Sequence, residues 1–178
     1  MKNNTSLVES LHRLEHLKKG DVFLKYGKPC TKIGMLQKGV MRGFVYDTEG
    51  NEVTTHFYQE GDMIIGTYIP NVNLTMTIEA IEECTISIAN YSEIMSLVNV
   101  NMKITEIITR EFQKLNNQLQ SRLVALLNLS SVKKYALFLD EYPNLINRIP
   151  HYYIAQYLGV TPTQLSRARR EFVTRNKD

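Results

Sequence analysis

The sequence lacks any long hydrophobic run. Apolar residues make up 43% of its 178 positions, but charged and polar residues interrupt them at short intervals. No run approaches the roughly 18 apolar residues of a membrane-spanning helix. The N-terminal segment Met-Lys-Asn-Asn-Thr-Ser also lacks the apolar core of a signal peptide. We therefore expect a soluble globular protein that stays in the cytoplasm and has no membrane partner.

Residues that commonly bind metals or carry out catalysis are few. The two cysteines, Cys30 and Cys84, fit no metal-ligand spacing and lie in strand-like stretches, where a small buried thiol is common. His12 and His16 are four residues apart but have no third ligand nearby, so solvent-facing imidazoles are the simpler interpretation. His56 is the only histidine in the strand-rich region, and one imidazole without convergent polar groups does not make a catalytic site. We predict no metal site, no cofactor and no enzymatic activity.

The N-terminal half changes its hydrophobic period near Gly20. Residues 5–19 carry Leu7, Leu11, Leu14 and Leu17 at helical spacing and predict a short amphipathic helix. Between Gly20 and about Ala89 the period falls towards two, and turn residues recur at short intervals. The strand candidates are Val22–Tyr26, Lys32–Gln37, Val40–Tyr46, Glu52–Gln59, Leu74–Ala80 and Thr85–Ala89. Such closely spaced antiparallel strands predict a small sandwich or barrel that can hold a small ligand.

A long helix is predicted from about Val100 to Leu129. Four apolar residues recur there at alternating steps of four and three, and Leu123, Leu126 and Leu127 continue the apolar face. These four are Ile108, Phe112, Leu115 and Leu119. The narrow seam favours a contact between the helices of two copies, while packing on the barrel of the same chain is the alternative. A second helix, Ser131–Glu141, is ended by Tyr142-Pro143.

The segment from Arg148 to Phe172 predicts two short helices joined by a tight turn. Gly159 can adopt the left-handed conformation that ends the first helix. The second helix, residues 162–174, follows a Thr161-Pro-Thr-Gln164 start, in which threonine caps the helix, proline takes its first position and glutamine reaches back to the cap. This arrangement is typical of a helix-turn-helix whose second helix enters the major groove of DNA.

The outer face of the second helix combines positive charge with hydrogen-bonding groups. Leu165, Ala168 and Phe172 make an inward stripe. The residues left outside are Thr163, Gln164, Ser166, Arg167, Arg169 and Arg170. Residues 148–178 carry a net charge of +4, against +3 for the whole chain, so positive charge is concentrated at this end. That segregation favours binding to DNA phosphates, although an ordinary helical hairpin with a solvated charged face is the alternative.

Several short segments, taken in order, resemble those of one known family. They are Leu17-Lys-Lys-Gly-Asp21, a glycine-containing hairpin ending Asp47-Thr-Glu-Gly-Asn-Glu-Val53, the turn Glu60-Gly-Asp62, the long helix and the C-terminal segment Tyr152–Arg167. Together they resemble the Crp/Fnr transcription regulators, and Tyr152–Arg167 is similar to the form common in Bacteroidetes-type members. The resemblance implies an α+β fold: an antiparallel β-roll like that of cyclic-nucleotide-binding domains in residues 1–99, a dimerisation helix in 100–129, and a helix-turn-helix domain in 130–178.

The resemblance also implies a function. Family members are homodimers that regulate transcription, bind double-stranded DNA at a pseudo-palindromic operator, and act through RNA polymerase when they activate. Ser166 and Arg167 occupy the family's base-reading positions, whereas Thr163 replaces the acidic residue that usually opens base contact. The DNA-binding residues that we predict are Tyr152, Thr161, Thr163, Gln164, Ser166, Arg167, Arg169 and Arg170. The predicted dimer residues are Ile108, Phe112, Leu115 and Leu119.

The effector loop departs from the members that bind cyclic AMP. Those members carry a Gly-Glu pair and an Arg-Ser or Arg-Thr pair where this chain has Gly66-Thr67 and Leu74-Thr75. Without the carboxylate and the guanidinium, a buried cyclic phosphate loses strong contacts and keeps its desolvation cost, so cyclic AMP is not the expected effector. These four residues are still the expected wall of any effector pocket. Two other functions stay open: a β-roll sensor that acts through protein contacts alone, and a cupin-like enzyme.

Overall fold

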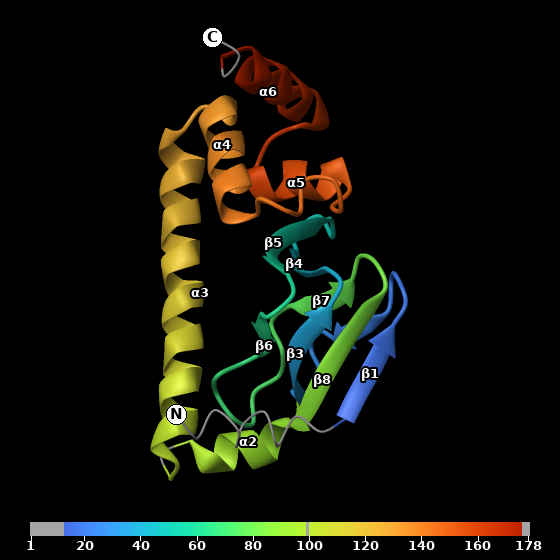
Figure 1. Cartoon of the computed structure of the whole chain (residues 1–178), viewed down its shortest axis with the longest axis vertical. Coiled ribbons are helices and arrows are strands. Elements are labelled where there is room, and N and C mark those ends of the chain that lie inside the picture. Colours follow the sequence, from blue (N-terminus) through green and yellow to red (C-terminus); the bar gives the residue numbers. More distant parts are fainter. Residues whose placement is uncertain (1–12, 99, 176–178) are drawn as a thin grey trace. The chain divides into compact units, whose positions relative to one another are not determined.

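The computed structural model describes residues 13–98 and 100–175 of the chain. These residues form two compact units, which divide between Lys114 and Leu115 (Figure 1). The boundary falls inside the long helix α3, Met102–Asn128. No helix within the described ranges is long and apolar enough to cross a membrane.

The first unit contains two antiparallel sheets of four strands each within its described residues. The strands are β1 Arg13–Leu17, β2 Val22–Leu24, β3 Lys32–Lys38, β4 Met41–Tyr46, β5 Glu52–Tyr58, β6 Met63–Ile64, β7 Thr77–Ala80 and β8 Cys84–Asn90. Their orders are β1-β8-β3-β6 and β2-β7-β4-β5, so the first strands pair with the last ones. This β-roll, followed by helices, confirms the predicted α+β class.

The predicted N-terminal helix is wrong where the structure describes it. Arg13–Leu17 is a strand paired with β8, with Arg13 opposite Ile88 and Leu17 opposite Cys84. Leucines three residues apart share a face of a helix but point to opposite faces of a strand. Leu14 is accordingly 58% exposed, while Leu17 is 8% exposed. The rest of the predicted helix, with Leu7, Leu11 and His12, lies outside the described residues.

The β-roll core fills the space between the two sheets. Its largest fully buried side chains come from both sheets and include Leu36, Met41, Ile64, Ile78 and Ile86. Packing is close at Gly34, where an added Cβ would lie 2.6 Å from Ile86 Cγ2 and 2.9 Å from the Phe23 ring. Only glycine fits at that position, because well-packed interiors have no room for an added methyl group.

A second apolar cluster links the roll to the helices that follow it. The sequence did not predict α2, Tyr91–Leu97, whose cap is the Asn90 side chain accepting from the backbone of Ser92 and Glu93. Ile94 of α2 packs with Ile104 and Ile108 of α3 and with Ile33 of β3. Ile108 is 6% exposed. This corrects its assignment to the dimer seam, because its side chain fills the core of its own unit.

The second unit is helical in its described residues. After the C-terminal part of α3 come α4 Ser131–Glu141, α5 His151–Leu158 and α6 Pro162–Arg175. The predicted second helix and the two-helix segment are confirmed. Ser130 caps α4 by accepting from the Lys133 amide, and the rings of Tyr135 and Phe172 meet edge to face at 5.6 Å. Ile154, Ala155 and Leu158 of α5 are buried, as their spacing predicts.

Candidate nucleic-acid interface and effector loop

The turn between α5 and α6 depends on one glycine. Gly159 has φ 61° and ψ 42°, the left-handed conformation. Its N–H donates to Gln156 O at 3.1 Å, and the Val160 N–H donates to Ala155 O at 3.0 Å. A Cβ at Gly159 would lie 2.9 Å from Leu126 Cδ2. The left-handed backbone conformation therefore favours glycine, and a larger residue would also force the end of the Leu126 side chain to shift.

A reciprocal capping box starts α6. The Gln164 N–H donates to Thr161 Oγ1 at 3.1 Å, and the Thr161 N–H donates to Gln164 Oε1 at 2.8 Å. These two bonds satisfy backbone donors that the first turn of a helix leaves unpaired. Because Gln164 Oε1 is engaged in the cap, pairing of this side chain with adenine would require the capping bond to break.

The outer face of α6 carries the side chains that the sequence placed there. Leu165 and Ala168 are each 2% exposed and hold the helix to its own unit. The exposed residues are Thr161, Thr163, Gln164, Ser166, Arg167 and Arg170, while Arg169 is half-buried. Tyr152, at the start of α5, is 51% exposed and contacts the Tyr153 ring at a tilt of 44°, with ring centroids 3.9 Å apart. The two helices thus bring cationic and polar groups onto one unit.

His151 belongs to this surface, although the sequence analysis did not predict it. Arg169 Nη1 lies 3.1 Å from His151 Nδ1. Desolvation, and then the Arg169 charge, lower the pKa of His151. Both residues, with Arg170, line an open hollow of about 640 Å³ beside Leu165 and Val173. His151 is the first residue of α5, and the N-termini of helices attract anions such as phosphates. That position was the signal in the sequence that could have placed His151 at a phosphate-binding surface.

The predicted effector loop is packed rather than hollow around Leu74. Leu74 is 2% exposed. An added Cβ at Gly66 would lie 2.3 Å from Leu74 Cδ2 and 2.8 Å from Leu24 Cδ1. Thr67 Oγ1 accepts from the Ile69 N–H at 3.1 Å, and Thr75 is exposed. The structure therefore brings Gly66 and Leu74 together in the core, while Thr75 faces solvent.

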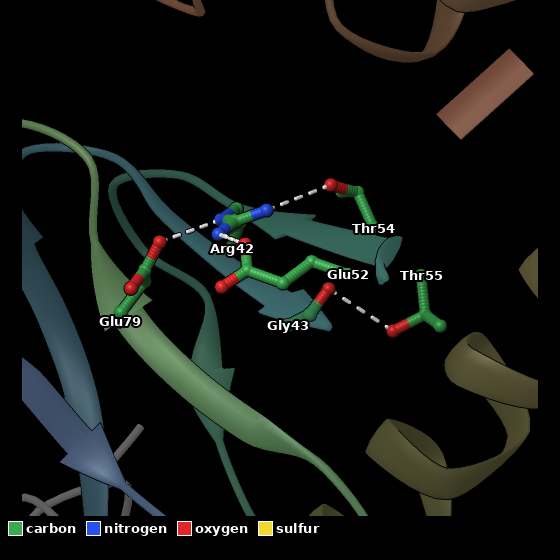
Figure 2. Close-up of polar contacts among 6 residues, drawn as sticks. All are labelled: Arg42, Gly43, Glu52, Thr54, Thr55 and Glu79. Atoms are coloured by element: carbon green, nitrogen blue, oxygen red, sulfur yellow. Dashed lines mark hydrogen bonds and ion pairs between the residues drawn. The ribbon is translucent and has the colours of Figure 1, made fainter. Parts of the chain in front are cut away.

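A buried arginine ties three strands of the second sheet together (Figure 2). Arg42 of β4 is 1% exposed. Its Nε lies 2.6 Å from Glu79 Oε1 of β7, and its Nη2 forms an ion pair with Glu52 of β5. Its Nη1 donates to Thr54 Oγ1 at 3.3 Å, and the guanidinium stacks 4.3 Å from the Phe44 ring centroid. The two carboxylates compensate the buried cation, a role that the alternating strand pattern did not reveal.

The remaining histidines and cysteines have local structural contacts. His16 Nδ1 lies 3.2 Å from Thr85 Oγ1 on the paired strand, and His56 packs edge to face on Tyr58. The Cys84 thiol, buried, donates to Val40 O, and burial raises the pKa of the half-buried Cys30 thiol. Among the described residues, no three His, Cys, Asp or Glu side chains are grouped as a metal site requires.

Comparison with known proteins identifies the fold. Residues 14–101 match the model of the cyclic nucleotide-binding domain. FixK2 from Bradyrhizobium japonicum is similar over 92% of this chain and 85% of its own, with a TM-score of 0.82 and 16% identity. A regulator from Eubacterium rectale, assigned to the Crp/Fnr family, is similar over 98% of this chain and 85% of its own, with a TM-score of 0.74 and 17% identity. The chain has the fold of the Crp/Fnr transcription regulators.

A third Crp/Fnr-type structure shows the same likeness. It is CLP from Xanthomonas campestris, described as responsive to c-di-GMP. It covers 98% of this chain and 93% of its own, with a TM-score of 0.76 and 11% identity. A search of curated proteins finds no significant match.

The residues of the predicted dimer seam lie on α3. Phe112 is 48% exposed and Leu119 is 47% exposed, while Leu115 is half-buried. Leu123 and Leu127 are 57% and 74% exposed. Phe112 also meets Tyr68 edge to face, with ring centroids 5.1 Å apart. Apart from Ile108, the seam residues thus present apolar surface that the described chain leaves uncovered or only partly covered.

Proposed function

We propose that this chain is a homodimeric transcription regulator that lays α6 in the major groove of double-stranded DNA. The observation that carries the proposal is the outer face of α6, where Thr163, Ser166, Arg167 and Arg170 are exposed together. The capping box and Gly159 hold this helix in a defined position. A rigid helix with hydrogen-bonding and cationic groups near its start suits base recognition.

The exposed residues divide by the chemistry that each side chain offers. Arg167 lies within the second turn of α6 and can donate two hydrogen bonds to guanine O6 and N7. Arg169 and Arg170 lie farther along α6, beside His151. They suit contacts with phosphates, because a cation there neutralises the phosphate charge without contacting a base. Thr163 and Ser166 flank Arg167, whereas Thr161 and Gln164 chiefly hold the helix start. Tyr152, exposed at the start of α5, suits a contact with the DNA backbone.

Pairing of two copies through α3 supplies the second recognition helix. Phe112, Leu115 and Leu119, continued by Leu123 and Leu127, form an apolar seam of the kind that helix pairs bury. A two-fold dimer presents two α6 helices to two half-sites, which is why its operator would be pseudo-palindromic. Homodimerisation and DNA binding together define the proposed regulator, which would work in the cytoplasm and contact RNA polymerase if it activates.

The β-roll is proposed not to bind cyclic AMP. Leu74 occupies the position at which cyclic AMP-binding members have arginine, and its side chain packs on Gly66 in the core. Thr67 replaces the carboxylate, and its hydroxyl already accepts from the Ile69 amide. A cyclic phosphate would therefore have to displace apolar packing without gaining a cation.

Mapping of the binding sites across the genome tests the function. We expect one enriched motif with two-fold symmetry and half-sites about one helical turn apart, 10–10.5 bp from centre to centre. A mobility shift with the purified protein on that motif should fall steeply with salt. No enrichment and no shift on any fragment would favour the alternative, a β-roll sensor that acts through protein contacts alone.

A further inference from the structure

A cavity of about 420 Å³ lies inside the C-terminal unit, among α3, α4 and α5. Ala125, Leu126, Leu137, Phe138 and Leu158 form its apolar wall. Small-molecule sites in proteins usually measure about 300–1,000 Å³ and combine such walls with a few polar groups. The residues around this cavity include none from α6, so the cavity is distinct from the proposed DNA-binding surface.

A chain of polar contacts lies at the side of this cavity. Arg122 Nε donates to Tyr157 O at 3.0 Å, and its guanidinium lies 4.4 Å from the Tyr157 ring centroid. The Tyr157 hydroxyl donates to Glu141 Oε2 at 3.0 Å. All three residues line the cavity. Because each side chain is positioned by the next, the Glu141 carboxylate is fixed in place before any ligand arrives.

The other oxygen of this carboxylate is left without a donor. Glu141 Oε1 is buried, and among the described residues no donor meets it in hydrogen-bond geometry. Burial raises the pKa of Glu141; hydrogen bonding from the nearby Tyr157, Tyr142 and Gln118 side chains and the charge of Arg122 lower it only in part. A buried acceptor without a donor loses its hydration with no compensating bond. A ligand that donates to Oε1 would recover that loss.

We propose that this cavity binds a small aromatic amine, whose ammonium group donates to Glu141 Oε1. The aromatic body would pack on Leu126, Leu137 and Phe138. An ammonium group supplies both the missing donor and the opposite charge, and charge-assisted hydrogen bonds are the stronger kind. A carboxylate or phosphate ligand would be repelled by Glu141, and Arg122 is already engaged with Tyr157. Lys134 and Asp140, which also line the cavity, offset each other in charge.

The position of the cavity gives the ligand a way to affect DNA binding. Leu126, in its wall, is the side chain closest to the missing Cβ of Gly159, and Leu158 ends α5. An occupant between α3 and α5 would therefore bias the placement of the helix pair that carries α6. This regulatory consequence rests on the proposed function, whereas ligand binding itself does not.

The seam and the cavity adjoin on α3. At 3.6 residues per turn, Ser121 and Ala125 lie about a third of a turn or more from Leu119, whereas Leu126, in the cavity wall, lies within about 20° of it. A second copy paired along the leucines would therefore reach the edge of the cavity, and the dimer measurement below distinguishes it from a small ligand.

NMR titration of the full-length ¹⁵N-labelled protein with tryptamine tests the site. We expect saturable shifts of amide signals from α3, α4 and α5, and about tenfold or weaker binding to Glu141→Gln, which keeps the side-chain shape but removes the charge. Ser121→Trp should abolish binding by filling the cavity from an exposed lining position. The matched control, Gln113→Trp, introduces the same ring at an exposed α3 residue in the other unit and should bind normally.

Three results would overturn the proposal. Absence of saturable tryptamine shifts would remove the site. Equal or tighter binding of indole-3-propionate, which exchanges the amine for a carboxylate, would contradict the role of Glu141. Loss of the dimer in Ser121→Trp but not in Gln113→Trp, measured by sedimentation, would show that a second copy occupies the cavity. If tryptamine binds but leaves the affinity for DNA unchanged, or if the protein binds no DNA, the ligand site stands and its regulatory role fails.

Discussion

At the scale of single residues, the proposed interface separates base reading from charge neutralisation. Arg167→Ala should lose preference at one position of each half-site, because the bidentate contact to guanine contributes about 1–3 kcal/mol of discrimination. Arg170→Ala should weaken binding to all DNA sequences about equally. It should also reduce the salt dependence of the binding constant by about one phosphate contact. Binding titrations on the operator and on copies mutated base by base measure both effects. If Arg167→Ala loses equal affinity for operator and random DNA, Arg167 is a phosphate contact instead.

Glu141 gives a residue-scale prediction about pH. Burial raises its pKa in the folded protein above the value in the unfolded chain, so its contribution to stability is greatest at low pH and is lost as pH rises through the folded pKa. Glu141→Gln still accepts from Tyr157 but cannot ionise. We therefore expect the variant to be more stable than the parent at pH 7, and the difference to shrink as pH falls towards 4. Urea unfolding at several pH values measures it; a constant difference would mean that ionisation of Glu141 is not the cause.

At the scale of elements, Gly159 controls the join between α5 and α6. Gly159→Ala should destabilise the C-terminal unit by about 1–2 kcal/mol for the left-handed conformation, with a further cost for the close contact to Leu126. Thermal unfolding should show a drop of at least roughly 4–8 °C, as expected for a unit of this size. Gly50→Ala is the matched control, because Gly50 has φ 84° and no atom within 4 Å of an added Cβ. Equal losses in both variants would show that the Leu126 contact costs nothing.

The elements that the sequence predicted well are those whose local chemistry and tertiary packing agree. The capping box at Thr161 and Gln164, the Gly159 turn and the period of α4 and α6 are all local, and the structure confirms them. β6 has two residues and α2 has seven, too few to show a period. The Arg13–Leu17 segment became a strand because pairing with β8 decides its backbone, and that partner lies about 70 residues away in the sequence.

The candidate sites show the same division between local and distant information. The outer face of α6 follows from spacing on one helix. Three other sites join residues from separate elements: the Arg42 cluster, the contact between His151 and Arg169, and the cavity at Glu141. Residue spacing in the sequence does not predict them. Ile108 fits the seam by period, but its burial depends on Ile33 and Ile94, whose positions only the folded chain reveals.

At the scale of the whole molecule, function depends on two copies. Leu119→Lys should prevent dimerisation, because it places a charge in an apolar seam whose burial is worth several kcal/mol at ~25 cal/mol per Å². Leu119 is a cleaner position than the half-buried Leu115, since it is 47% exposed and its replacement leaves the core of its own unit intact. Sedimentation at micromolar concentration should show monomer for Leu119→Lys and dimer for Gln113→Lys, an exposed α3 control. The monomer should still bind a single half-site. It should lose the added affinity that a dimer gains when its two α6 helices bind both half-sites of the operator. A Leu119→Lys variant that remains dimeric would place the interface elsewhere on the molecule, and the spacing of the two recognition helices would then have to follow from that other surface.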